Sequence, residues 1–380
     1  MINKKYLLLL STFLVVSFAS INLQSQTGEP LILEGIDRIY KIEFDSAEAI
    51  FDKVISDYPF DPEGYFFKAM VQWWRIYINR GTEDNDKEFF LRVDKVIEVT
   101  NNILEKDPND AKALFYKGGA IGYRGLLRSI RSSWLNAASD GREALNLIED
   151  ASKINPENPD IIFGLGIYNY FAEFVPEKYP MLKPLMIIFP KGDRVKGLLQ
   201  INQAIQNSHY ARIEAENILG YINLRYEKNF NAAEIQFRNL HNKFPNNPIF
   251  EGDLGRALIG QSKWADALVV WKSVVGKSDS GLAGYKNLEL KRDANYYTAL
   301  TLLKLNRTTE AESFSVQAIE LSEEIDDDDN AFKSYAYLHA GEIFGRNGKT
   351  GKAREYFDKV LTMENFNNIH EEANRLKLQF

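Results

Sequence analysis

GEIFGRNGKTGKAREYFDKV, residues 341–360, is the stretch that decides the fold of this chain. It places the small residue Gly341 12 positions before a second small residue, Ala353, and the larger Phe357 and Val360 follow. Two small residues at this spacing let two antiparallel helices, A and B, cross closely, while the larger residue fills the gap to the next pair. The same spacing recurs upstream in Ala299, Ala311, Ser315 and Ala318, and in Gly255, Ala267, Trp271 and Val274.

The spacing extends to the start of the chain, where Gly35 precedes Ala47 by 12 positions. Apolar residues recur every three or four positions from Leu31 onward, which favours helices, and no alternating strand pattern is present. Prolines 59, 108, 156 and 245 stand where second helices must end, because proline lacks the amide that a helix uses. We expect an all-α, right-handed solenoid of about eight helix pairs over residues 31–380, in which residues 368–380 form a capping helix. The pairs are expected to begin near Gly28, Pro62, Ala111, Pro159, Ile213, Pro248, Arg292 and Ser334.

This pattern resembles the tetratricopeptide-repeat family over residues 28–367. The tracts 107–114 and 155–160 are similar to the junctions between repeats in that family. The resemblance implies a solenoid whose helix A lines a concave surface, and it implies binding of a partner rather than catalysis.

Three repeats depart from the regular spacing. The gap between small positions is 27 in the second repeat, 26 in the third and 31 in the fourth, so the repeats over about 62–210 are expanded. Roughly seven residues added to each helix make almost two turns, which keeps the apolar face in phase. The fourth repeat carries an insert at about 171–193 with prolines 176, 180, 184 and 190, for which we expect a folded loop or a short broken helix over a neighbouring surface.

The expanded region resembles a narrower group. The tracts RSIRSSW (128–134), GLGIYNY (164–170) and FPKGDR (189–194) look like the tetratricopeptide-repeat protein 39 and inclusion-body-clearance family and related uncharacterised bacterial envelope proteins. That similarity covers mainly residues 62–210. It implies a non-enzymatic interaction protein and brings no catalytic residue with it.

The N-terminus is typical of an export signal. Lys4 and Lys5 precede the apolar stretch 6–19, and Ser17 and Ala19 are small residues at the positions that a signal peptidase recognises. We expect a Sec-type signal peptide at 1–19, a linker at 20–30, and a periplasmic or secreted protein that associates with the bacterial envelope. An uncleaved anchor is the alternative, but the stretch is shorter than the roughly 20 residues that span a bilayer.

Composition excludes several classes of function. The net charge is −7, and it becomes −9 after residues 1–19 are lost, so bulk charge does not favour nucleic acid or anionic membranes. The absence of cysteine excludes disulfides and thiol chemistry. His209, His241, His339 and His370 form no metal-binding spacing, and no phosphate loop or nucleophile elbow is present. The acidic run 323–329 lacks the glycine of a calcium loop and favours a solvated loop. We therefore expect no catalytic site, metal or cofactor.

A basic stripe is one candidate site. Arg124, Arg128 and Arg131 are spaced by four and three residues, so they share one helix face. They could capture a carboxylate or phosphate. The alternative is pairing with local acids such as Glu143, Glu149 or Glu173.

The positions of helix A that face the concave surface give a second candidate site. Aromatic and apolar residues there suit a peptide or a hydrophobic ligand. The alternative is that the insert covers them and makes them core. The candidate residues are Phe66, Met70, Trp73, Phe115, Phe163, Ile167, Tyr170, Tyr221 and Arg256.

Two functions follow from these sites. The first is an exported, non-enzymatic scaffold that binds a protein or peptide in the concave groove, with selectivity from the four arginines. The second is a carrier or sensor of an apolar, lipid-like molecule, in which residues 171–193 close over Phe163, Tyr170 and Trp73.

Overall fold

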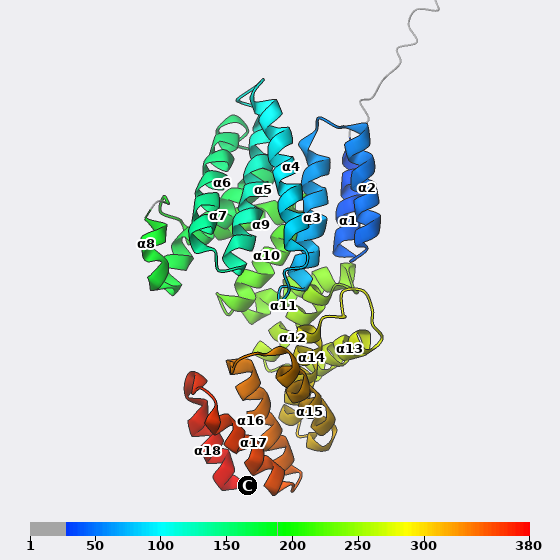
Figure 1. Ribbon diagram of the computed structural model, residues 1–380, viewed down its shortest axis with the longest axis vertical. Helices are drawn as coiled ribbons and strands as arrows, with labels where there is room; N and C mark the ends of the chain where they lie inside the picture. Colours follow the sequence, from blue (N-terminus) through cyan, green and yellow to red (C-terminus); the bar gives the residue numbers. More distant parts are fainter. Residues whose placement is uncertain (1–27, 188) are drawn as a thin grey trace, which may run out of the picture.

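The structure is a computed structural model that describes residues 28–187 and 189–380. In these ranges every regular element is a helix, and the helices pack as successive antiparallel pairs (Figure 1). The predicted all-α solenoid of eight pairs is confirmed. The predicted signal peptide at 1–19 lies outside the described residues. The first helix begins at Glu29, inside the stretch expected to be a linker.

The helices follow the expected repeat boundaries closely. Helix A of several repeats begins at an Asp-Pro or Asn-Pro step, where the acid or amide caps the first turn and the proline occupies a position that needs no amide. The pairs are α1 (Glu29–Tyr40) with α2 (Phe44–Asp57), α3 (Pro62–Ile78) with α4 (Asp86–Leu104), α5 (Ala111–Ile130) with α6 (Trp134–Ile154), α7 (Pro159–Lys178) with α9 (Arg194–Asn207), α10 (Arg212–Arg225) with α11 (Phe230–Lys243), α12 (Pro248–Gly260) with α13 (Trp264–Asp279), α14 (Leu288–Lys304) with α15 (Thr308–Ile325), and α16 (Ala331–Arg346) with α17 (Thr350–Thr362). The short η1 (Pro180–Leu182) and α8 (Lys183–Met186) lie within the fourth repeat, and η2 (Phe366–Asn368) leads into the capping helix α18 (Ile369–Gln379).

The 12-residue spacing has a direct steric cause. A Cβ atom added at Gly341 would lie 2.5 Å from Phe357, and one at Gly255 would lie 2.6 Å from Trp271. Glycine is therefore required where helix A crosses the large side chain of helix B. The same large residue also meets the next repeat, because the Trp271 ring stacks on Tyr297 with centroids 4.6 Å apart.

The turn between helix A and helix B is also repeated. In six of the pairs it contains one residue with a left-handed backbone, which reverses the chain in three or four residues. Ile42 is the least expected of these, since a β-branched residue rarely adopts a φ of 63°. The residues concerned are Ile42, Ser132, Lys228, Ser262, Asn306 and Gly348.

The expanded repeats contain long helices. Helices α3 to α6 have 17 to 21 residues, whereas α12 and α17 have 13. Part of the expansion of the second repeat lies in the connection 79–85 rather than in the helices. In the fourth repeat α7 continues through Pro176 to Lys178, so the first part of the stretch expected to be a folded loop or a short broken helix is an extension of α7. The short η1 and α8 follow it.

The solenoid closes on itself, which the repeat pattern did not predict. The Tyr40 ring at the end of α1 lies 5.1 Å from Trp74 on α3 and 5.5 Å from Phe244, just before α12. The buried Asn247 side chain donates a hydrogen bond of 3.0 Å to the Tyr40 carbonyl oxygen. One hydrophobic core therefore joins the first repeats to the sixth, and a second core lies in the last repeats and α18.

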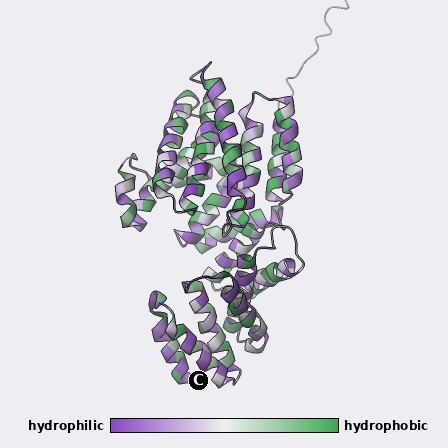
Figure 2. Ribbon diagram, viewed as in Figure 1, coloured by the Kyte–Doolittle hydropathy of each residue, from purple (hydrophilic) through white to green (hydrophobic). Residues whose placement is uncertain are grey.

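Hydrophobic and hydrophilic residues are mixed along the helices (Figure 2). None of the helices in the described ranges is long and apolar enough to span a membrane.

Candidate partner-binding groove

The predicted aromatic lining of helix A is core. Phe66, Met70, Trp73, Phe163 and Tyr170 are all buried, so their expected exposure in an open groove is wrong. Phe115, Ile167 and Tyr221 are half-buried.

Neighbouring repeats, rather than the insert, cover these aromatic residues in the first half of the chain. The ring of Trp73 lies 5.2 Å from Tyr123 on α5. The start of α10 enters the same region, where Glu214 accepts hydrogen bonds from Tyr40 at 3.1 Å and Tyr123 at 3.4 Å. The concave side of the first three repeats is therefore occupied by the chain itself.

The insert packs elsewhere. Its helix α8 contacts α6 and α7, and the hydroxyl of Tyr168 donates to the carbonyl oxygen of Pro190. Tyr170, one of the residues expected beneath the insert, packs against Phe174, which belongs to 171–193 but lies on the continuation of α7, and beside Tyr226. The structure does not bring Phe163, Tyr170 and Trp73 together under residues 171–193.

The three arginines of the basic stripe make intramolecular pairs, with acids other than the three expected. Arg124 binds Asp140 through two nitrogens, at 2.8 and 3.2 Å, and Arg128 binds the same carboxylate at 2.7 Å. Arg131 binds Asp86 at 2.6 and 2.9 Å and also donates to two backbone carbonyl oxygens of the connection 79–85. The stripe therefore divides between two acids instead of forming one anion site.

Arg256, the fourth candidate arginine, also forms ion pairs within the protein. Its guanidinium binds Asp253 at 3.0 Å and Asp293 at 2.8 Å and lies over the rings of Trp271 and Tyr297. Burial opposes its charge, yet the two aspartates and Tyr297 raise the pKa of Arg256. This arginine joins the sixth and seventh repeats.

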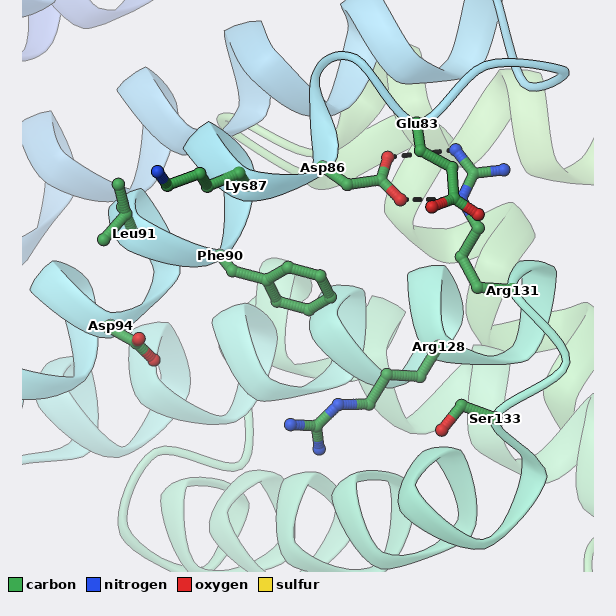
Figure 3. A pocket seen from close by; sticks show the side chains of 9 residues that line it. All are labelled: Glu83, Asp86, Lys87, Phe90, Leu91, Asp94, Arg128, Arg131 and Ser133. Atoms are coloured by element: carbon green, nitrogen blue, oxygen red, sulfur yellow. Dashed lines mark hydrogen bonds and ion pairs between the residues drawn. The ribbon is translucent and has the colours of Figure 1, made fainter.

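An open groove of about 630 Å³ lies between α4 and the end of α5. Figure 3 shows the Arg128 guanidinium below the ring of Phe90, while Arg131 is turned toward Asp86. Phe90 is half-buried, and Leu91 is 55% exposed. The residues that line it are Glu83, Asp86, Lys87, Phe90, Leu91, Asp94, Arg128, Arg131 and Ser133.

Within the part of the chain that the structure describes, Arg128, which lines this groove, has guanidinium nitrogens that are free to bind a second acceptor. Asp140 is 2% exposed and is shared by the guanidinium groups of Arg124 and Arg128. Arg128 uses one nitrogen for that carboxylate, and its side chain is 30% exposed at the groove. The arrangement suits a segment that presents a carboxylate to Arg128 and an apolar side chain to Phe90 and Leu91.

Sequence reasoning missed Lys87, Phe90 and Leu91, because only helix A was considered as a binding surface. A signal was present. Leu91 is an apolar residue among the charged residues Lys87, Glu88, Asp94 and Lys95 of the exposed side of α4.

A smaller cavity of about 170 Å³ lies where α3, α5 and α7 meet Tyr210. Lys112, its one basic lining residue, already binds Asp61 at 2.6 Å and Glu63 at 3.1 Å, and Asp160 accepts a hydrogen bond from the Ala211 amide at 2.9 Å. Burial raises the pKa of Glu63. No group of acids and histidines that could hold a metal occurs in the described ranges.

Comparisons with known proteins agree with the architecture. Residues 334–367, which contain α16 and α17, match the tetratricopeptide-repeat family model. No curated protein matches the sequence. The crystal structure of the APC/C hetero-tetramer Cut9–Hcn1 is similar in fold, with a TM-score of 0.54 and 14% identity over 99% of this chain. This chain spans 59% of the length of that one.

Two other solved structures match with lower scores. The pilF structure of Pseudomonas aeruginosa has a TM-score of 0.44 and 14% identity, covering 69% of this chain and 97% of its own. A Rap protein complexed with competence and sporulation factor has a TM-score of 0.45 and 11% identity, covering 93% of this chain and 96% of its own. At such identities the comparisons speak to the fold alone.

Proposed function

We propose that this chain, which has the fold of tetratricopeptide-repeat proteins and matches their family model over residues 334–367, is an exported scaffold without catalytic activity. Proteins of that class generally bind protein partners and are usually non-enzymatic. Its partner is a protein or peptide that lies in the groove between α4 and α5. A partner carboxylate binds Arg128, and an apolar partner side chain packs on Phe90 and Leu91. The observation that carries this proposal is the buried Asp140 carboxylate shared by two guanidinium groups.

The proposal moves the binding surface from the concave side to the outer groove. The concave side of the first repeats is filled by α10 and the sixth repeat, so a peptide there would have to displace core residues. No observation favours the alternative of an apolar small-molecule carrier, since Trp73 and Tyr170 are packed in separate places.

The proposal includes export from the cytoplasm and a relationship to the tetratricopeptide-repeat protein 39 and inclusion-body-clearance family and its bacterial envelope relatives. We propose cleavage after Ala19 and residence in the periplasm or outside the cell, in keeping with the resemblance to bacterial envelope proteins. Intact-mass measurement of protein purified through a C-terminal tag tests this. A chain that begins at Ser20 agrees, and a chain that keeps residues 1–19 contradicts it.

Site-specific photocrosslinking tests the groove. A photoreactive phenylalanine analogue replaces Leu91, and the same analogue replaces Val269 as a control, since Val269 is 72% exposed on the distant α13. After irradiation of cells that make the protein, we expect a discrete covalent adduct at position 91 and none at position 269.

The substitution Arg128→Gln in the crosslinking variant connects the adduct to the proposed chemistry. The adduct should weaken at least about tenfold, because one charge-assisted hydrogen bond is lost. Asp140 keeps Arg124, so folding should be maintained, which circular dichroism checks. The proposal is wrong if position 91 gives no adduct, or if the adduct is unaffected by Arg128→Gln.

A further inference from the structure

The tip of the insert in the fourth repeat exposes large apolar side chains and also carries positive charge. Met181 is 84% exposed and Ile187 is 81% exposed, and Tyr179 is also exposed. Figure 1 shows α8 projecting to one side of the stacked pairs. We define the insert tip as Lys178, Tyr179, Met181, Lys183, Ile187 and Lys191.

The base of the insert is firmly held although its tip projects. A Cβ atom at Gly192 would lie 2.5 Å from the carbonyl oxygen of Asn169, so the chain must pass close to α7 there. The Arg194 amide donates to Glu173 at 2.7 Å, and the Arg194 side chain binds Glu227. The tip is therefore presented by an anchored base.

The charge of the insert tip is opposite to that of the chain. Residues 178–192 contain three lysines and no acid, in a chain of net charge −7. Lys178, Lys183 and Lys191 are exposed, and none of them pairs with an acid in the described ranges. Many other lysines of the protein do pair, such as Lys263 with Glu234 at 2.6 Å.

We propose that the insert tip is a contact for an anionic membrane surface. Met181 and Ile187 enter the boundary between headgroups and acyl chains, and Tyr179 lies at headgroup level, where its ring and hydroxyl are both accommodated. The three lysines bind anionic headgroups while their aliphatic stems follow the apolar residues inward. This inference is independent of the partner groove.

The shape of the tip favours a lipid surface over a protein. A specific protein interface buries about 1,000 Å² or more and needs a complementary face, whereas the exposed side chains here form a small protrusion. A membrane requires only that apolar side chains project with cations beside them. Contact through one tip is weak and reversible, and the attraction of its lysines falls with salt.

Vesicle flotation tests the proposal with the protein as it is purified from the producing cell. The vesicles contain either equal parts of phosphatidylglycerol and phosphatidylcholine or phosphatidylcholine alone. We expect the protein to float with the anionic vesicles at low salt and to remain largely unbound with neutral ones. All variants share one N-terminus, so any contribution of residues 1–27 cancels in their comparison.

Two variants separate the apolar and the charged contributions. Met181→Asp with Ile187→Asp should lower partitioning into anionic vesicles more than about tenfold. Each of Lys178→Gln, Lys183→Gln and Lys191→Gln should lower it about five-fold, on anionic vesicles only. The matched control, Val269→Asp with Leu378→Asp, changes exposed apolar residues elsewhere and should leave partitioning unchanged.

Circular dichroism and size-exclusion chromatography accompany each variant. The proposal is overturned if the control pair lowers partitioning as much as the insert pair, or if the insert variants bind like the parent. It is also overturned if the parent is oligomeric and Met181→Asp with Ile187→Asp makes it monomeric, since the tip would then join two copies of this chain.

Discussion

At the scale of single residues, Glu214 is a carboxyl group in the first half of the solenoid whose ionised form is disfavoured by burial. Its carboxyl group lies between α1 and α5 with Tyr40, Tyr123 and Tyr77 around it. Burial raises the pKa of Glu214 to about 7, although hydrogen bonds from Tyr40 and Tyr123 act in the opposite direction. The closed core therefore holds this carboxyl most easily when it is protonated.

The stability of the protein should depend on the protonation of Glu214. A folded pKa of about 7 exceeds the ordinary 4.5, so the contribution to stability is complete below about pH 4.5 and is lost as pH rises through 7. The loss is on the order of 3 kcal/mol. Glu214→Gln should therefore have little effect at pH 5 and stabilise the protein at pH 8, as urea denaturation measures.

His339 is shared by the parent and the Glu214→Gln variant, so its contribution cancels. Burial lowers the pKa of His339 to about 4, which makes stability rise with pH in the acid range. An equal difference between parent and variant at pH 5 and pH 8 would show that Glu214 does not titrate in this range.

The acid that pairs with Arg124 in the basic stripe could have been predicted from the sequence. Arg124 and Asp140 stand eight residues either side of Ser132, the left-handed residue of the turn between α5 and α6. Residues placed symmetrically about such a turn face each other in an antiparallel pair. The acids expected instead, Glu143 and Glu149, lie further along α6. The turn position, rather than the number of acids nearby, decides the pair.

At the scale of elements, the connection 79–85 between α3 and α4 is held by Arg131 from the end of α5. The guanidinium binds Asp86 and the carbonyl oxygens of Arg80 and Thr82. The sequence indicated that this repeat is expanded, but the spacing of small residues carries no information on how an irregular connection is fixed. One side chain from the next repeat does so here.

Removing this side chain should loosen the connection locally. Arg131→Ala leaves Asp86, whose side chain is 12% exposed, and two carbonyl oxygens without their partner, at a cost of about 2 kcal/mol. Hydrogen exchange should quicken at residues 79–86. Lys95→Ala, which breaks an exposed pair with Glu98, should change stability by less than about 0.5 kcal/mol. Similar effects of the two substitutions would contradict this role for Arg131.

At the scale of the whole molecule, local spacing and global closure are separate properties. The 12-residue spacing specifies how two helices cross, and it holds in the first, sixth, seventh and eighth pairs. Closure depends on the small rotation between successive pairs, which accumulates over five repeats and is set by helix lengths and side-chain volumes together. Tyr40, Phe244 and Asn247 therefore gave no sign in the sequence that they would meet.

Closure makes distant repeats unfold together. Trp74 is buried between Tyr40 and Phe250, with ring centroids 5.1 and 5.8 Å away. Trp74→Ala should cost about 3–5 kcal/mol, because it removes a large core side chain. Native-state hydrogen exchange should then quicken in α1 and α12 together, although they are far apart in sequence.

The last repeats provide the matched comparison. Phe357→Ala removes a large side chain from the separate core of α14 to α18, where Phe357 lies against Gly341. Its effect on hydrogen exchange should be confined to the last repeats, because a linear stack couples each repeat only to its neighbours. If Trp74→Ala affected only α2 to α5 and spared α12, the protein would behave as an open stack. Paired effects in α1 and α12 would establish that the first and sixth repeats form one cooperative unit.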